Sequence, residues 1–235
     1  MEFRKHLGSG GFAEVYEGSY VRLTVAIKKM KPSAKNPTAT NEAFEAEAAL
    51  PPLDHPHVIK IFAAIYQPEP LLITELVPDA KTLQTLIDHE ATYDWKHYAR
   101  QLVSALTYLH HRYILHLDIK PANVLLTQQN ICKLGDFGCS QYALTPTISQ
   151  LQGTLQYRAP ELLRGLLPST KADIYSLGIT LWSLKTRQQP YEGLNHFIIA
   201  YQVVSQHLRP TEDSEFVNLW HADPERRPDA YNISL

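Results

Sequence analysis

The sequence predicts an α+β chain built as two lobes, a small strand-rich lobe followed by a larger, mainly helical one. Apolar alternation typical of strands is concentrated before residue 78, and helical periodicity dominates after it. The 235 residues, 44% of them hydrophobic, suffice to bury a core without disulfides. We therefore expect a bilobal arrangement over 1–235, with an N-lobe of 1–77, a C-lobe of 78–235 and a crevice between them.

The N-lobe is predicted to open with strands. Residues 12–29 alternate, with β-branched and aromatic side chains at strand positions, and Gly18-Ser19 predicts a turn between two strands. The next ten residues, 31–40, are rich in Pro, Ser, Thr and Asn. This composition predicts a loop.

One helix and two more strands are expected in the rest of the N-lobe. The acidic, alanine-rich stretch 41–50 predicts a helix that Pro51 and Pro52 end, because proline has no N–H to continue the hydrogen-bonding pattern. Apolar stretches at 58–66 and 71–77 predict strands.

Helices are predicted in three segments of the C-lobe. Helical periodicity is found over 82–89, 95–111 and 172–184, and the middle segment places several leucines on one face. Together with the preceding strands, this order of elements predicts the α+β class.

Composition excludes several classes of protein. Lys and Arg number 22 against 24 Asp and Glu, so no long-range positive field favours nucleic acid or an anionic membrane. No apolar run is long enough to span a bilayer, and the first residues carry no signal-peptide core. Two cysteines, Cys132 and Cys139, do not make a disulfide framework. We expect a cytoplasmic protein without membrane insertion or nucleic-acid binding, and the sequence is compatible with a monomer.

A glycine-rich segment begins at Gly8 and has the form G-x-G-x-x-G-x-V, with Ala13 at the third glycine and Val15 at its end. A dinucleotide-binding fold accepts alanine there, but it requires a buried strand before the glycines and a helix after them. Strand-like alternation follows instead, so we place the segment in a hairpin. An ordinary glycine-rich hairpin remains the alternative.

A lysine after this loop supports a phosphate-binding function. Lys28 closes the apolar strand that begins at Val25, and such a lysine can reach nucleotide phosphates. It needs an anionic partner, which Glu42, Glu45 or Glu47 can supply. Spacing alone does not choose among the three.

The segment from His116 to Asn123, followed by Asp136-Phe137-Gly138, predicts phosphoryl transfer. Asp118 can accept the proton of an attacking hydroxyl, and Lys120 can face the same phosphate. The Asn123 amide and the Asp136 carboxylate supply the hard oxygen ligands that Mg²⁺ prefers. We interpret His116 as a core histidine that orients the loop.

These motifs resemble the catalytic domain of eukaryotic protein kinases, and the resemblance covers almost the whole chain. Further landmarks follow in the family's order: Gly153-Thr154, Ala159-Pro160-Glu161, Asp173-Ile174-Tyr175-Ser176, Trp220 and Arg226-Arg227-Pro228. The resemblance implies a bilobal kinase fold that uses ATP and Mg²⁺. It also implies that Asp173 braces the catalytic loop and that Arg227 pairs with Glu161.

The resemblance assigns the nucleotide site residue by residue. Glu47 becomes the ion-pair partner of Lys28, and Thr74 the gatekeeper before the hinge. The implied nucleotide-site residues are Leu7, Gly8, Ser9, Gly10, Gly11, Phe12, Ala13, Glu14, Val15, Ala26, Lys28, Glu47, Thr74, Glu75, Val77 and Leu125. Asp118 and Lys120 are the implied catalytic residues, and Asn123 and Asp136 the metal ligands.

A narrower resemblance concerns the type of kinase. Lys120 and Gly153-Thr154 resemble the serine/threonine class, and the catalytic and activation-segment motifs resemble the Mos family, whose members activate MAP kinase kinase in oocyte meiosis. Two alternatives remain open. One is another MAP kinase kinase kinase of the Raf type; the other is a pseudokinase scaffold, suggested by Ala13 and the two prolines after the acidic helix.

Leu117 stands where most kinases place an arginine that binds a phosphorylated activation loop. Leucine cannot bind phosphate, so we expect activity without phosphorylation of Thr145, Thr147 or Ser149. Ala13 should cause only a modest loss of activity. The helix-ending prolines are expected to loosen the coupling between the lobes.

Overall fold

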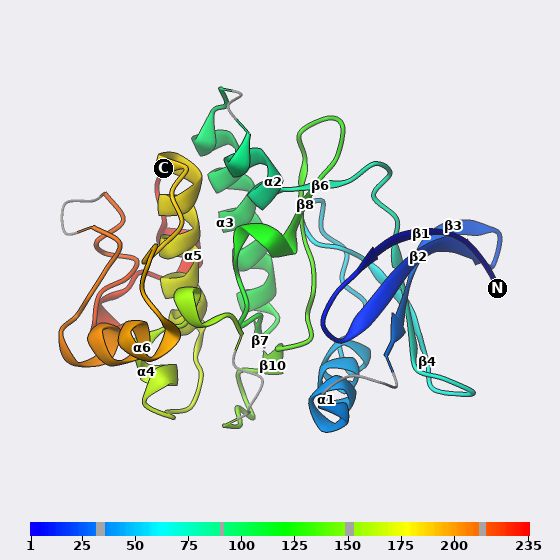
Figure 1. The fold of residues 1–235 in the computed structure, drawn as a ribbon, viewed down its shortest axis with the longest axis horizontal. Coiled ribbons are helices and arrows are strands. Elements are labelled where there is room, and N and C mark those ends of the chain that lie inside the picture. The colour runs from blue at the N-terminus through cyan, green and yellow to red at the C-terminus, as the bar shows by residue number, and fades with distance from the viewer. Residues whose placement is uncertain (32–35, 90–91, 149–152, 212–214) are drawn as a thin grey trace.

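A strand-rich N-terminal part and a helical C-terminal part lie side by side, which confirms the α+β class (Figure 1). The computed structural model describes residues 1–31, 36–89, 92–148, 153–211 and 215–235. An antiparallel sheet in the order β1-β2-β3-β5-β4 dominates the N-terminal part, with one helix beside it. Its elements are β1 (Glu2–Ser9), β2 (Ala13–Tyr20), β3 (Leu23–Met30), α1 (Pro37–Ala48), β4 (Ile61–Ile65) and β5 (Leu71–Glu75).

The turn between β2 and β3 lies at Val21 and Arg22, so the predicted turn at Gly18-Ser19 was wrong. Both turn residues have positive φ, 46° and 66°, a conformation that is uncommon outside glycine. Neither side chain therefore signals the turn in the sequence. Gly18 lies inside β2, opposite Val25 of β3.

Gly18 is needed for the packing of β1 against β2 and β3. A Cβ atom at this position would lie 2.3 Å from the carbonyl oxygen of Glu2 and 2.4 Å from Cδ1 of Ile27. These distances are too short for any side chain. The glycine thus allows β1 to approach the sheet.

Helix α1 begins at Pro37, within the segment predicted as a loop, and ends at Ala48. The Asn36 side chain accepts a hydrogen bond from the Ala39 amide at 3.1 Å, and proline fits the first turn because its missing N–H is not needed there. The predicted helix 41–50 therefore began too late. Cap residues and loop residues share the same composition, which explains the error.

The C-terminal part is built around α5, whose residues from Ala172 to Leu184 are all buried. Helix α3 has the same bounds as its prediction, while α2 and α5 differ from theirs by one or two residues at each end. The helices are α2 (Leu83–Asp88), α3 (Trp95–His111), α4 (Pro160–Leu163), α5 (Thr170–Thr186) and α6 (His196–Ser205), with short 3₁₀ turns at Pro121–Asn123, Leu155–Tyr157, Pro224–Arg226 and Ala230–Asn232.

Two small ladders hold the loops between them in place. One sheet has the order β6-β8-β9, and β7 pairs antiparallel with β10. The bounds are β6 (Lys81–Thr82), β7 (Ile114–Leu115), β8 (Val124–Leu126), β9 (Cys132–Leu134) and β10 (Gln141–Tyr142). Because β7 and β8 flank 116–123 while β9 and β10 flank 135–140, the ladders bring these two loops together.

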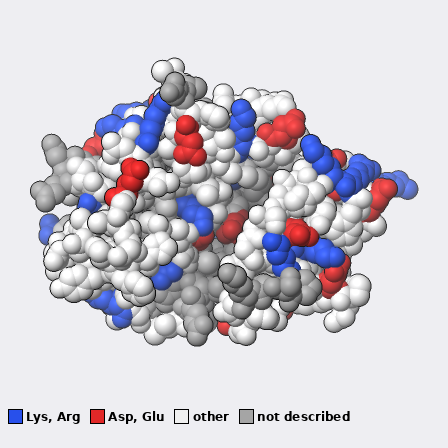
Figure 2. Space-filling model, in the orientation of Figure 1, with Lys and Arg blue, Asp and Glu red and all other residues white. Residues whose placement is uncertain are grey.

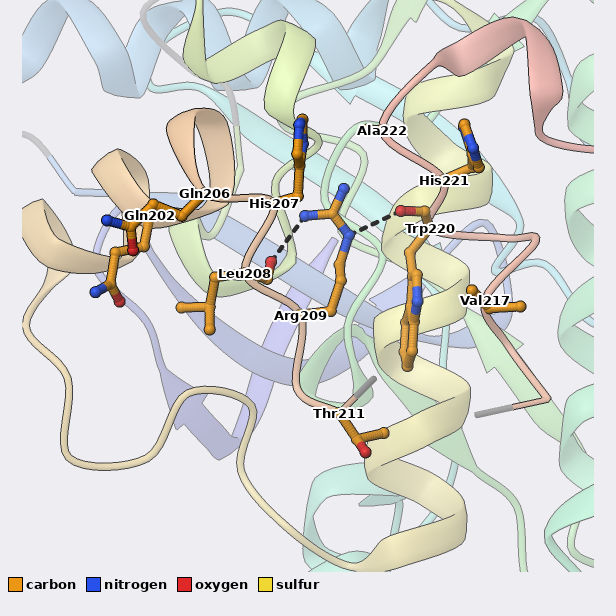
Figure 3. Close-up of a pocket in the computed structure, with 10 residues that line it drawn as sticks. All are labelled: Gln202, Gln206, His207, Leu208, Arg209, Thr211, Val217, Trp220, His221 and Ala222. Carbon is orange, nitrogen blue, oxygen red and sulfur yellow. Dashed lines mark hydrogen bonds between the residues drawn. The ribbon is translucent and has the colours of Figure 1, made fainter. Parts of the chain in front are cut away.

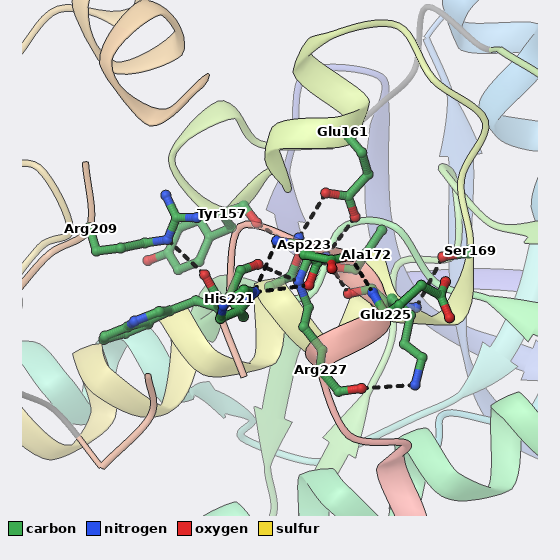
Figure 4. Close-up of polar contacts among 12 residues, drawn as sticks. Tyr157, Glu161, Ser169, Ala172, Arg209, His221, Asp223, Glu225 and Arg227 are labelled. Atoms are coloured by element: carbon green, nitrogen blue, oxygen red, sulfur yellow. Dashed lines mark hydrogen bonds and ion pairs between the residues drawn. The ribbon is translucent and has the colours of Figure 1, made fainter. Parts of the chain in front are cut away.

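A buried ion pair fastens the C-terminal end to α4 (Figure 4). The Arg227 guanidinium donates to both carboxylate oxygens of Glu161, at 2.6 and 2.8 Å. Its side chain is fully buried and also donates to the carbonyls of Lys171 and His221, at 2.8 Å each. The pairing that the kinase resemblance implies is therefore confirmed.

Among the described helices, none combines the length and the apolar character needed to cross a membrane.

Candidate active site

Asp118 is the centre of a hydrogen-bonded cluster in the loop between β7 and β8. Its carboxylate accepts from Nζ of Lys120 at 2.8 Å, from Nδ2 of Asn123 at 2.8 Å and from the amide of Thr154 at 2.7 Å. These donors come from two segments of the chain, the loop that carries Asp118 itself and the segment around Thr154. The carboxylate is thereby fixed in one orientation.

Charge balance at Asp118 favours the ionised form. Burial opposes ionisation, but Lys120 and the hydrogen bonds from Thr154 outweigh it, so the pKa of Asp118 lies below its ordinary value. A carboxylate in this state can accept a proton or a hydrogen bond from a hydroxyl group.

Thr154 and Gly153 belong to this cluster, although the sequence singled them out as family landmarks and as a sign of the serine/threonine class rather than as site residues. Lys120 Nζ donates to Thr154 Oγ1 at 2.5 Å. Gly153 has φ of +74°, and a Cβ there would lie 2.2 Å from the carbonyl oxygen of Leu117. A Gly-Thr pair shortly before Ala159-Pro160-Glu161 is the signal that could have identified them.

The loop that carries Asp118 is held in place by hydrogen bonds to α5. Asp173 of α5 accepts from the amides of His116 and Leu117, at 2.9 and 2.8 Å. His116 is fully buried, and its Nε2 lies 3.0 Å from the carbonyl oxygen of Gly135. These contacts confirm the bracing function of Asp173 and agree with a core histidine that orients the loop.

Lys28 joins the N-terminal sheet both to α1 and to the segment that follows β9. Its Nζ forms an ion pair with Glu47 and a second one with Asp136, the latter at 2.8 Å. Burial would lower the pKa of Lys28, but the two carboxylates outweigh it and raise the pKa. Of the three glutamates that spacing left open, Glu47 is the partner, as the kinase resemblance implied.

Asp136 and Asn123 offer oxygen donors suited to a hard divalent cation. The Asp136 side chain is 52% exposed, and Lys28 holds its pKa below the ordinary value. Within the described residues there is no cluster of three or more His, Cys, Asp or Glu side chains that could enclose a metal. A cation here would depend on few protein ligands and on phosphate oxygens, which is the pattern of Mg²⁺ rather than of Zn²⁺ or Ca²⁺.

The glycine-rich segment forms the turn between β1 and β2, as predicted. The Gly10 amide donates to the Ala13 carbonyl at 2.8 Å. Lys31, which the sequence analysis missed, donates to Ser9 Oγ at 2.6 Å and to the Gly10 carbonyl at 2.8 Å. Glu14 accepts from a tyrosine hydroxyl, whereas Gly11 and the flanking side chains of Leu7 and Phe12 are exposed.

The apolar residues assigned to the nucleotide site come from both parts of the molecule. Val15 pairs with Lys28 between β2 and β3, and Ala26 pairs with Thr74 between β3 and β5. Leu125 comes from β8, in the other part of the molecule. The sequence-predicted set is thus divided between two sheets.

Glu75 and Val77, the hinge residues that the kinase resemblance places after Thr74, differ in their surroundings. The Glu75 carboxylate accepts from Lys133 Nζ at 2.7 Å and from the Lys60 amide at 3.2 Å, so this side chain already has partners. Val77 is buried at 7% exposure. Backbone groups, rather than these side chains, are what the hinge could offer a ligand.

Figure 2 shows basic and acidic groups together in the hollow between the two parts of the molecule. A separate cavity of about 380 Å³ lies between α6 and the segment that follows it (Figure 3). Arg209 in that cavity donates to the carbonyls of Leu208 and Trp220, at 2.7 and 2.8 Å. Its lining includes none of the site residues predicted from the sequence.

Comparison with known proteins points to one family. Residues 1–233 match the protein kinase domain family. The chain is 37% identical over 232 residues to the serine/threonine-protein kinase mos of Patiria pectinifera, covering 92% of this chain and 65% of that protein. For the mos kinase of Xenopus laevis the identity is 38% over 262 residues, covering 97% and 72%. For the proto-oncogene serine/threonine-protein kinase mos of Rattus norvegicus it is 36% over 239 residues, covering 87% and 66%. The chain thus spans about two thirds of the length of these relatives.

Proposed function

Because this chain belongs to the protein kinase family, and within it to the serine/threonine kinases of the Mos family, we propose that it transfers the γ-phosphate of ATP to a serine or threonine hydroxyl of a protein. The observation that carries the proposal is the oriented Asp118 carboxylate, held by Lys120, Asn123 and Thr154. Phosphoryl transfer depends mainly on positioning and on charge stabilisation, and this cluster provides both.

Each site residue then has a defined function. Asp118 accepts the proton of the attacking hydroxyl, and Lys120 neutralises charge on the phosphate being transferred. Lys28 steadies the remaining phosphates and is itself held by Glu47. A lysine between two carboxylates remains protonated throughout the physiological pH range.

Asn123 and Asp136 would hold Mg²⁺. When bound, the cation would supply positive charge against the phosphate oxygens. The protein's own contribution is to orient these two side chains. Asn123 is fixed by donating to the backbone and side-chain oxygens of Asp118, both at 2.8 Å, while Asp136 is fixed by Lys28.

We propose MAP kinase kinase as the substrate, in the cytoplasm of oocytes during meiosis. The catalytic loop and activation-segment motifs support this assignment through their resemblance to the Mos family, and so does the similarity of the chain to the mos kinases of three species. A Raf-type kinase would phosphorylate the same class of substrate. The scaffold alternative would bind partners without transferring phosphate.

The test is phosphate transfer from Mg-ATP to a kinase-dead MAP kinase kinase. We expect Asp118→Asn and Lys28→Met each to reduce kcat at least about 100-fold, since each removes a group that acts on the reacting atoms. Lys29→Met is the matched control, because Lys29 lies next in the same strand and pairs with Glu69 at 2.8 Å. It should retain activity.

Two outcomes would contradict these proposals separately. Transfer to a generic serine/threonine substrate, but not to MAP kinase kinase, would reject the substrate and keep the kinase. Nucleotide binding without transfer to either substrate would favour the scaffold.

We also propose that activity does not depend on phosphorylation of the activation segment. Leu117 is buried, and the segment is tied internally by Thr147, whose amide donates to Gln141 Oε1 at 2.8 Å. Thr145 is described as well, whereas Ser149 lies outside the described residues. Treatment with an active phosphatase should leave the transfer rate equal to that with an inactivated phosphatase. A loss of activity that maps to Thr145, Thr147 or Ser149 would refute the proposal.

A further inference from the structure

The chain that follows Asp136 runs along the last two turns of α1. A Cβ at Gly138 would lie 3.6 Å from Oε1 of Glu47. The same Cβ would lie 3.1 Å from the Cβ of Ala43, so the backbone there approaches the helix closely. In Figure 1, β7 and β10 lie beside α1. These contacts place the segment against the turn that carries Glu47.

Two more contacts reach the carboxyl end of the helix. The Tyr142 hydroxyl donates to the carbonyl oxygen of Ala49 at 3.2 Å, and the Ser140 hydroxyl donates to that of Ala46 at 3.5 Å. The last carbonyls of any helix have no partner within the helix, so they need one from elsewhere.

The sequence after α1 supplies few backbone N–H groups for the last carbonyls of the helix. Pro51 and Pro52 carry no N–H, so they cannot donate to the carbonyls of Glu47 and Ala48, four residues earlier. The amide of Leu50 bonds to Glu47 at 3.4 Å instead of continuing the pattern. Backbone donors are therefore scarce at the end of α1.

We propose that Tyr142 is a positioning residue, which holds the end of α1 through its hydroxyl and thereby keeps Glu47 against Lys28. Ser140 adds a weaker, longer contact of the same kind. The backbone of Tyr142 pairs with β7, opposite Ile114. The position of Tyr142 is therefore set by the strand that precedes the Asp118 loop. The contact thus couples the position of α1, which carries Glu47, to the position of β7 and β10.

This inference rests on the proposed kinase function, but nucleotide binding tests it independently of phosphate transfer. Tyr142→Phe keeps the ring and removes the donor. We expect the Kd for a fluorescent ATP analogue with Mg²⁺ to rise about three-fold, as for one partly exposed hydrogen bond. Amide exchange in peptides covering residues 43–50 should accelerate by a similar factor.

Tyr231→Phe is the matched control. It removes a tyrosine hydroxyl that donates to Asp229 at 3.1 Å, at an exposed position in the C-terminal part. This variant should match the wild type in nucleotide affinity and in the exchange of α1. Thermal unfolding of both variants is the control for a general loss of stability, and we expect equal midpoints.

A double variant tests whether Tyr142 acts through Glu47. In a Glu47→Gln background the further change Tyr142→Phe should leave nucleotide affinity unchanged, because the ion pair it supports is already lost. Additive losses in the double variant, or a Tyr142→Phe single variant equal to wild type in binding and exchange, would overturn the proposal. Failure of phosphate transfer in the wild type would concern only the proposed function.

Discussion

At Asp118, the surroundings decide how a buried carboxylate ionises. Without partners, burial would favour the protonated acid, but Lys120 and Thr154 reverse that preference. The same surroundings have the opposite effect on a neighbouring thiol. Burial and the negative charge of Asp118 raise the pKa of Cys139 to about 12.

Cys139 should therefore react slowly with iodoacetamide in the folded protein. Only the thiolate reacts, and an ordinary cysteine has a pKa of about 8.5, so at pH 8 we expect alkylation of Cys139 to be at least about 100-fold slower than in the urea-unfolded chain. The folded rate should keep rising with pH well above 9, where the unfolded thiol has levelled off. Mass spectrometry of the labelled peptides measures both. Equal rates at pH 8 in the folded and unfolded chains would contradict the assigned environment.

Among the elements, those with a strong apolar pattern were predicted best. Helix α3 was predicted residue for residue because Leu102, Leu106 and Leu109 form one buried face. The start of α1 was missed because a side-chain cap has the composition of a loop. The β2–β3 turn was missed because Val21 and Arg22 adopt left-handed conformations only under tertiary constraint.

Gly18 gives a prediction for the sheet. Gly18→Ala should destabilise the protein by about 1–3 kcal/mol, because the new methyl group meets the backbone of β1. Gly11→Ala is the control, since no atom lies within 4 Å of a Cβ at that position. We expect it to change the free energy of unfolding by less than about 0.5 kcal/mol. Urea denaturation measures both, and a Gly18→Ala variant as stable as wild type would show that β1 is not packed as described.

Across the whole molecule, a few polar contacts join distant segments. The Lys28–Asp136 pair spans 108 positions and the Arg227–Glu161 pair spans 66. The sequence revealed Lys28 and Asp136 because the chemistry requires such residues, and Arg227 and Glu161 through the resemblance to the kinase family. Spacing alone did not select Glu47 from three glutamates, although the kinase resemblance did. Neither indicated Lys31 or Tyr142, because their contacts depend on how distant segments pack in the folded chain.

Removing Arg227 should have a large effect on stability. Arg227→Met leaves the Glu161 carboxylate buried without its charge partner, and we expect a loss of about 3–5 kcal/mol in the free energy of unfolding. Lys185→Met is the control, because the Lys185–Glu215 pair is about half exposed, at 44% and 45%. Exposed pairs contribute about 0–1 kcal/mol. Chemical denaturation measures the free energy of unfolding of both variants. Equal losses would show that the buried pair stabilises the protein no more than the exposed pair does.

The Arg227–Glu161 pair also has a consequence for synthesis of the chain. A ribosome makes Glu161 66 residues before Arg227, so the growing chain carries an acidic group whose burial must wait until Arg227 has been made. Helices α4 and α5 can form during translation before Arg227 is made, but the pair that fastens α4 cannot. We expect nascent chains released before residue 227 to leave α4 with the Glu161 carboxylate unpaired and exposed, and to be bound by chaperones.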